Sequence, residues 1–195
     1  MQIEYNDHEM IVTFGKEEFD GKTVHFHGEQ LKDGSFLACP LFVNQVGTGT
    51  FTFGGKTYKI DEEVVGEELA AMMRAISAYC EGTSQRVMFE EIEFVPYIPS
   101  KGKLIATRRD ELIILIEEGT FAGQTVRWWG ELLYDGFALI PFAAAFVRPP
   151  SQEQLSDISL KGIKVIQEVE KSEYPALMQV FRDICETERE KLQFV

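Results

Sequence analysis

Residues 121–141 read FAGQTVRWWGELLYDGFALIP, and residues 19–40 read FDGKTVHFHGEQLKDGSFLACP. The two stretches share eleven residues when a single one-residue gap is allowed. The likeness extends upstream, since residues 7–14 align with residues 109–116 at the same offset of 102. A period this long that occurs only twice does not suit a solenoid, in which many short repeats stack. The sequence therefore predicts an internal duplication that folds as a fused dimer.

The repeat also includes a helix and a last strand. Residues 63–81 align with residues 168–186 at an offset of 105, and in both stretches apolar residues recur with helical spacing. Both copies then end alike, with EIEFV at residues 91–95 and KLQFV at residues 191–195. Each copy is therefore expected to have a helix followed by a closing strand.

Domain boundaries follow from the repeat. Residues 96–102 contain two prolines and a glycine, which is typical of a linker, so the predicted repeats are residues 1–95 and 103–195. Each repeat is expected to be an antiparallel β-meander with one α-helix and a closing strand, an α+β architecture. One helix cannot cover a sheet of five or more strands. We therefore expect the copies to pack together about a pseudo-two-fold axis.

The strand at residues 23–27 alternates apolar and polar side chains, which indicates a half-buried strand. His25 and His27 share its polar side, and Arg127 and Trp129 hold the same positions in the second copy. An exposed tryptophan beside an arginine is typical of a binding hot spot. We predict that these four residues bind a partner. The alternative is that this side packs against the other copy as core.

The dipeptide Asp-Gly at residues 33–34 and 135–136 predicts two hairpin tips, because a two-residue type I′ turn needs positive φ at both positions. This turn would place Glu29 on an apolar side of the sheet. Gly28 and Gly130 would then be β-bulges that change the side on which later residues point. In the second copy both sides of this hairpin are apolar, so its strands are expected to be buried on two sides.

Glu29 and Glu131 are the candidate catalytic residues. Burial raises the pKa of a carboxyl group, and a pseudo-two-fold axis could bring the two together for acid/base work, as in glycoside hydrolysis. The alternative is structural, with each glutamate accepting hydrogen bonds from backbone amides at the bulge. The chain has no GxSxG, HExxH, CxxC, Walker A or GxGxxG motif. We therefore favour a protein that is not an enzyme over a small hydrolase or lyase.

Composition limits the partners. The 195 residues are 45% hydrophobic, 26% charged and carry a net charge of −13, as in an ordinary globular protein. Residues 1–100 have 17 acidic against 7 basic side chains, whereas residues 101–195 have 15 against 12. An acidic domain is a poor ligand for nucleic acid. The charge predicts either simple solubility or a basic protein partner.

The cysteines and the hydropathy indicate the compartment. Cys39, Cys80 and Cys185 are an odd number without CxxC spacing, so we expect buried thiols in a reducing environment. Neither a signal peptide nor a membrane span is expected. The sequence thus predicts a cytoplasmic binding or assembly module, a monomer or weak homodimer, with a protein partner. No cofactor is expected, and His25-x-His27 alone is too small a ligand set for a metal. The acidic first copy would supply recognition.

Overall fold

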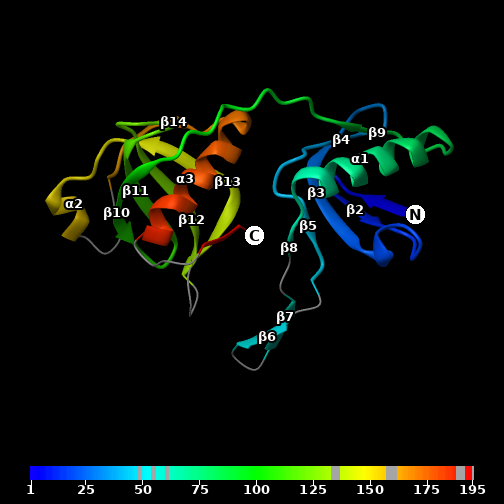
Figure 1. The fold of residues 1–195 in the computed structure, drawn as a ribbon, viewed down its shortest axis with the longest axis horizontal. Helices are drawn as coiled ribbons and strands as arrows, with labels where there is room; N and C mark the ends of the chain where they lie inside the picture. Colours follow the sequence, from blue (N-terminus) through cyan, green and yellow to red (C-terminus); the bar gives the residue numbers. More distant parts are fainter. Residues whose placement is uncertain are drawn as a thin grey trace. The chain divides into compact units, whose positions relative to one another are not determined.

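Figure 1 shows a computed structural model of the chain, coloured from blue at the N-terminus to red at the C-terminus. It describes residues 1–47, 50–53, 56–59, 62–132, 137–156, 162–187 and 192–194, with only the backbone at 50–53, 56–59, 186–187 and 192–194. The chain divides into two compact units, Met1–Glu91 and Ile92–Val195. The fold is mixed α+β with two largely antiparallel sheets, which confirms the predicted class.

The first unit has a sheet in the order β1-β2-β3-β4-β9, and β5 links β3 to β8. Its strands are β1 (Gln2–Tyr5), β2 (Glu9–Thr13), β3 (Thr23–Gln30), β4 (Phe36–Ala38), β5 (Asn44–Gln45), β8 (Glu62–Glu63) and β9 (Val87–Phe89). A 3-10 turn, η1 (Phe19–Gly21), connects β2 to β3, and β6 (Thr50–Phe53) forms a separate ribbon with β7 (Lys56–Lys59). The single α-helix described in this unit is α1 (Gly66–Glu81).

Helix α1 covers one side of this sheet. Met72 and Ile76 lie one turn apart on its inner face and are fully buried against a cluster that includes Val12, Val24 and Phe26. This confirms the predicted apolar stripe at its centre. At its start the prediction is wrong for Val65, which precedes the helix and is exposed.

The second unit has the order β10-β11-β12-β13-β14, and β15 also pairs with β13. Its elements are β10 (Lys101–Thr107), β11 (Glu111–Glu118), β12 (Thr125–Leu132), β13 (Phe137–Val147), α2 (Gln152–Ser156), β14 (Val165–Glu168), η2 (Lys171–Glu173), α3 (Tyr174–Thr187) and β15 (Leu192–Phe194). Trp128 is fully buried, with its ring edge-to-face with Tyr174 and Phe181 of α3. Its indole N–H donates to the Ile140 carbonyl at 2.8 Å, so the largest core side chain leaves no unpaired donor.

The strand pairs follow one scheme in the two units. Glu9 pairs with His27 across β2 and β3, and Glu111 pairs with Trp129 across β11 and β12, both at the offset of 102. The closing strands β9 and β15 run parallel to β4 and β13. Strand β13 spans in one piece what β4 and β5 form in the first unit. The units differ between β5 and β8, where the first has the β6–β7 ribbon, and between β13 and β14, where the second has α2.

The tip of the first hairpin lies where the sequence predicts it, but the predicted turn type is wrong. The Leu31 N–H donates to the Ser35 carbonyl at 2.8 Å, and the Gly34 N–H donates to the Leu31 carbonyl at 2.9 Å. Gly34 has φ +82°, whereas Asp33 is not left-handed. The loop therefore has three residues and ends on a left-handed glycine. The tip at 135–136 lies outside the described residues.

The longer loop shifts the register by one residue, so Glu29 pairs with Leu37 and is exposed. Glu131 is exposed as well, so the predicted burial of both glutamates is wrong. The expectation of two buried sides in the second hairpin is also wrong. Leu139 is fully buried there, but Leu132 and Ile140 are each 48% exposed.

Gly28 and Gly130 lie next to breaks in register, but the prediction that they are bulges is wrong. Between Trp128 and Gly130 the extra residues belong to β13, where residues 140–143 oppose residue 129 alone. Alternation along β3 and β12 is therefore uninterrupted, and Glu29 and Glu131 stay on the outward side. A Cβ atom on Gly28 would lie 2.4 Å from the Leu37 carbonyl oxygen, and one on Gly130 would lie 2.1 Å from the Ala138 carbonyl oxygen. The Gly28 N–H donates to the His8 carbonyl in the loop before β2, and the Gly130 N–H donates to the Asp110 carbonyl in the loop before β11. Close approach of two backbones therefore requires glycine here.

The segment predicted as a linker is hydrogen-bonded to the second unit. The Ile98 N–H in this segment donates to Thr120 Oγ1 at 2.7 Å. Val95, the last residue of the predicted first repeat, also belongs to the second unit, and its N–H donates to the Ser172 carbonyl at 2.9 Å. The Tyr97 hydroxyl donates to Asp183, which raises the pKa of Tyr97 to about 12. None of the three cysteines forms a disulfide; Cys39 and Cys185 are buried as predicted, whereas Cys80 is partly exposed. Among the described helices, none has the length and apolarity to span a membrane.

Candidate functional site

A row of side chains crosses the first sheet on the side opposite α1. Glu4 pairs with Ile11, Ile11 with His25, His25 with Asn44, and Asn44 with Glu63. Cross-strand partners point to the same side of a sheet, so these side chains are neighbours. Glu4 is exposed and the others are partly exposed. Together with Glu9 and His27, which lie on the same side, we call this row the polar face.

Glu9 connects the two histidines of the polar face. Its Oε1 lies 2.9 Å from His25 Nδ1, and its backbone pairs with that of His27. The His25 and Glu9 side chains are 35% and 38% exposed, so water reaches the pair. Exposed pairs of this kind contribute about 0–1 kcal/mol to stability. The contact orients the imidazole on the surface more than it holds the fold together.

His27 is more buried than an ordinary surface histidine. Burial lowers the pKa of its imidazole, the Glu9 carboxylate opposes this, and His25 adds to the lowering. The folded unit therefore holds the His27 proton less tightly than the unfolded chain does. Stability from His27 is complete above the unfolded pKa of about 6.5 and is lost as the pH falls through the lower pKa of the folded state.

We expect His27→Gln to reduce the loss of stability of the first unit between pH 8 and pH 5. Both tryptophans lie in the second unit, so indole fluorescence follows that unit alone while far-ultraviolet circular dichroism follows both. Denaturant titrations read by the two signals separate the units. In the variant, the unfolding transition seen by fluorescence should depend on pH as in the wild type. If the transition seen by circular dichroism also depends on pH as in the wild type, His27 does not have this role.

The corresponding row in the second unit has a different chemistry. It runs through Ala106, Ile113, Arg127, Ala145 and Glu168. Ala106, Ile113 and Ala145 are buried in one cluster with Val147 and Ile163, and Leu155 and Trp129 pack against it. The second sheet is thus covered on this side by residues of its own unit, from α2 and the chain that follows it.

Arg127 takes the place of His25, and Glu111 takes that of Glu9. The Arg127 Nε forms an ion pair with the Glu111 carboxylate, and its guanidinium carbon lies 4.7 Å from the centroid of the Trp129 ring. Glu111 is only 2% exposed. Burial raises the pKa of Glu111, and the charge and hydrogen bond of Arg127 act against that rise. An acid and a base at the same two positions are therefore exposed in one unit and buried in the other.

No protein-family model matches the chain, and neither does any curated protein or solved structure. The function must therefore be inferred from the geometry of each unit.

The predicted binding residues fall into two groups. His25 and His27 share the polar face of the first unit, whereas Arg127 and Trp129 belong to the second unit. Glu9 and Glu111, which contact His25 and Arg127, were not predicted from the sequence. The signal was present, because an acid recurs at the offset of 102 in DHEM and RDEL.

Glu29 and Glu131 lie in different units, and each is exposed. The backbone amides of Gly28 and Gly130 donate to the carbonyls of His8 and Asp110, at 3.0 and 3.1 Å. The predicted alternative role of the glutamates, as acceptors for these amides, is therefore filled by the backbone. Within the described residues, no group of three His, Cys, Asp or Glu side chains has the geometry to hold a metal ion.

We expect acrylamide to quench the indole fluorescence weakly, because Trp128 is fully buried and Trp129 packs against the apolar cluster of its own unit. The emission should shift to the red and quenching should rise to the level of free N-acetyltryptophanamide only on unfolding. Quenching of a large fraction of the signal in the native state would place Trp129 in solvent, as its predicted role in binding requires.

Proposed function

We propose that the chain is an internal duplication that acts as a cytoplasmic binding or assembly module without enzymatic activity, and that it recognises a protein through the polar face of its first unit. The single observation that carries this is the contrast between corresponding rows. Ala106, Ile113 and Ala145 are buried in the second unit, whereas Glu4, Ile11 and Asn44 are exposed or partly exposed in the first. A sheet side kept polar and accessible in only one of two similar units is available for recognition.

The duplication is supported by the shared pairing scheme. Corresponding residues pair at constant offsets in β2–β3 and β11–β12, and both units end in a parallel closing strand. The proposal includes packing of the two copies about a pseudo-two-fold axis. Cross-linking mass spectrometry tests this part, because symmetric packing requires links at corresponding positions of the two copies. Links confined to unrelated positions would contradict it.

The partner is a protein with a basic surface. The polar face carries the carboxylates of Glu4, Glu9 and Glu63, and none of the described residues that define it is a lysine or an arginine. Its unit lies within the more acidic half of the chain. Complementary charge speeds encounter and rejects acidic competitors more than it adds affinity. The partly exposed Ile11, between Glu4 and His25 in the row, supplies the apolar contact that such an interface needs.

The experiment is affinity capture from the source cells with a matched pair of variants. Glu4→Lys reverses one charge on the polar face, and Glu17→Lys makes the same change at an exposed position in the loop that follows β2. A protein recovered with the wild type and with Glu17→Lys, but lost with Glu4→Lys, is the expected result. Equal recovery with all three chains, or recovery of nothing above the resin, contradicts the proposal.

A further inference from the structure

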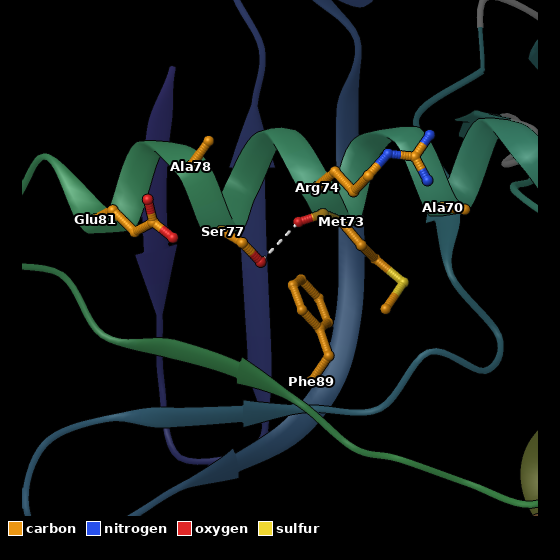
Figure 2. Close-up of a pocket in the computed structure, with 7 residues that line it drawn as sticks. All are labelled: Ala70, Met73, Arg74, Ser77, Ala78, Glu81 and Phe89. Atoms are coloured by element: carbon orange, nitrogen blue, oxygen red, sulfur yellow. Dashed lines mark hydrogen bonds between the residues drawn. The ribbon is translucent and has the colours of Figure 1, made fainter.

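A groove lies on the first unit between α1 and β9, away from the polar face. Figure 2 shows its lining, with Ala70, Met73, Ser77 and Glu81 along the helix and the Phe89 ring standing beneath them. Its volume is about 400 Å³, within the range of ligand-binding pockets. Met73 and Phe89 are partly buried, so the floor is apolar while water still reaches it.

Strand β9 offers an open edge to this groove. It pairs with β4 on one side, and within the described part of the chain no strand pairs with its other side. The Arg86 carbonyl and the Glu90 amide bond to β4, so by alternation the backbone groups of Val87 and Phe89 point outward. The Cys80 thiol lies beside the Val87 backbone: burial raises the pKa of this thiol, and the Val87 backbone lowers it. The outward backbone groups directly below the groove are those of Phe89.

Charges mark the ends of the groove. Arg74 and Glu81 line it two helical turns apart, about 10 Å along the axis. Among the described residues neither takes part in an ion pair. About 10 Å corresponds to about three residues of an extended chain. The groove is thus complementary to an extended segment with an acidic and a basic residue about that far apart.

We propose that this groove binds an extended peptide segment of a partner protein, which adds a short strand at the edge of β9 beside Phe89. Main-chain hydrogen bonds to the edge give affinity, and an apolar side chain of the segment contacts Met73 and Phe89. The acidic residue of the segment lies at Arg74 and the basic residue at Glu81. In this mode of recognition, the sheet edge binds the main chain of the peptide and the neighbouring helix contacts its side chains.

The test is selection of random linear peptides displayed on phage against the full chain. We expect enriched peptides to carry an acidic and a basic residue about three positions apart with an apolar residue between them. The double variant Arg74→Glu with Glu81→Arg should enrich the opposite order of charges. Ser77→Trp fills the groove from an exposed helical position and should weaken binding of a selected peptide about tenfold or more. Circular dichroism checks that this variant is folded.

Glu4→Lys serves as the control, because it alters the polar face and should leave peptide binding unchanged. Loss of partner capture with Glu4→Lys therefore reports on the proposed function, and loss of peptide binding with Ser77→Trp reports on the groove. The inference is overturned if the wild type enriches nothing above the blank, if the double variant enriches the same order of charges, or if folded Ser77→Trp binds the peptides as the wild type does.

Discussion

Replacing Glu111 by alanine is expected to destabilise the second unit by about 3 kcal/mol, because it leaves the Arg127 guanidinium unpaired in a largely buried position. Glu111 is 2% exposed, and it forms an ion pair with Arg127. Taking one charge from a buried pair costs far more than the pair contributes, since the remaining charge has lost its hydration. The neighbouring cluster around Ile113 and Trp129 is apolar.

The first unit contains the matched control. Glu9 holds the corresponding position, but its contact with His25 is exposed, so Glu9→Ala should cost about 0–1 kcal/mol. Denaturant unfolding followed by indole fluorescence measures the second unit, and circular dichroism measures both. A shift of the fluorescence transition with Glu111→Ala and none with Glu9→Ala is expected. Equal small effects would mean that Arg127 finds water or another partner.

The second large effect is expected for Gly130→Ala, which should destabilise the same unit by about 3 kcal/mol. The new Cβ atom would lie 2.1 Å from the Ala138 carbonyl oxygen and 2.5 Å from the Phe137 ring. The carbonyl belongs to the paired strand β13, so relief requires the two strands to separate at the bulge. The loss therefore comes from backbone displacement, which a rotamer change cannot relieve.

Gly15→Ala is the control for this substitution. A Cβ atom on Gly15 meets nothing within 4 Å, and its φ lies outside the left-handed region. Alanine there should leave both transitions in place or raise stability slightly by restricting the unfolded chain. If Gly130→Ala unfolds at the wild-type denaturant concentration, the close approach of β12 and β13 is not required for the fold.

Local sequence patterns predicted where strands, helix and hairpin tip lie, but not the strand register. Alternation at Thr23–Gln30 correctly separates the buried Val24 and Phe26 from the outward His25, and helical spacing finds the buried Met72 and Ile76. Asp-Gly at 33–34 correctly marks a hairpin tip. The same dipeptide suits both a two-residue loop and a three-residue loop that ends on a left-handed glycine, so it does not fix the register. That one-residue difference decides the side on which Glu29 points.

The candidate site could not be predicted from the alternation of side chains alone. Alternation places His25 and Arg127 on the outward sides of their sheets, but it does not say what covers those sides. In the second unit Leu155 and Ile163 pack over that side, from a segment that has no counterpart in the repeated stretch. The pairing of Glu9 with His25 and of Glu111 with Arg127 depends on the strand register, which only the three-dimensional structure specifies.

The parallel closing strands have a consequence for how the chain folds. Phe36 pairs with Val87, and Phe137 pairs with Leu192, so each sheet is completed only when the last strand of its unit has been synthesised. Such distant pairings close slowly, because a long loop must be ordered first. During translation the first unit can close before most of the second unit exists. That order reduces the chance that β9 docks on β13, an exchange of strands between similar units that is a characteristic misfolding route of repeat proteins.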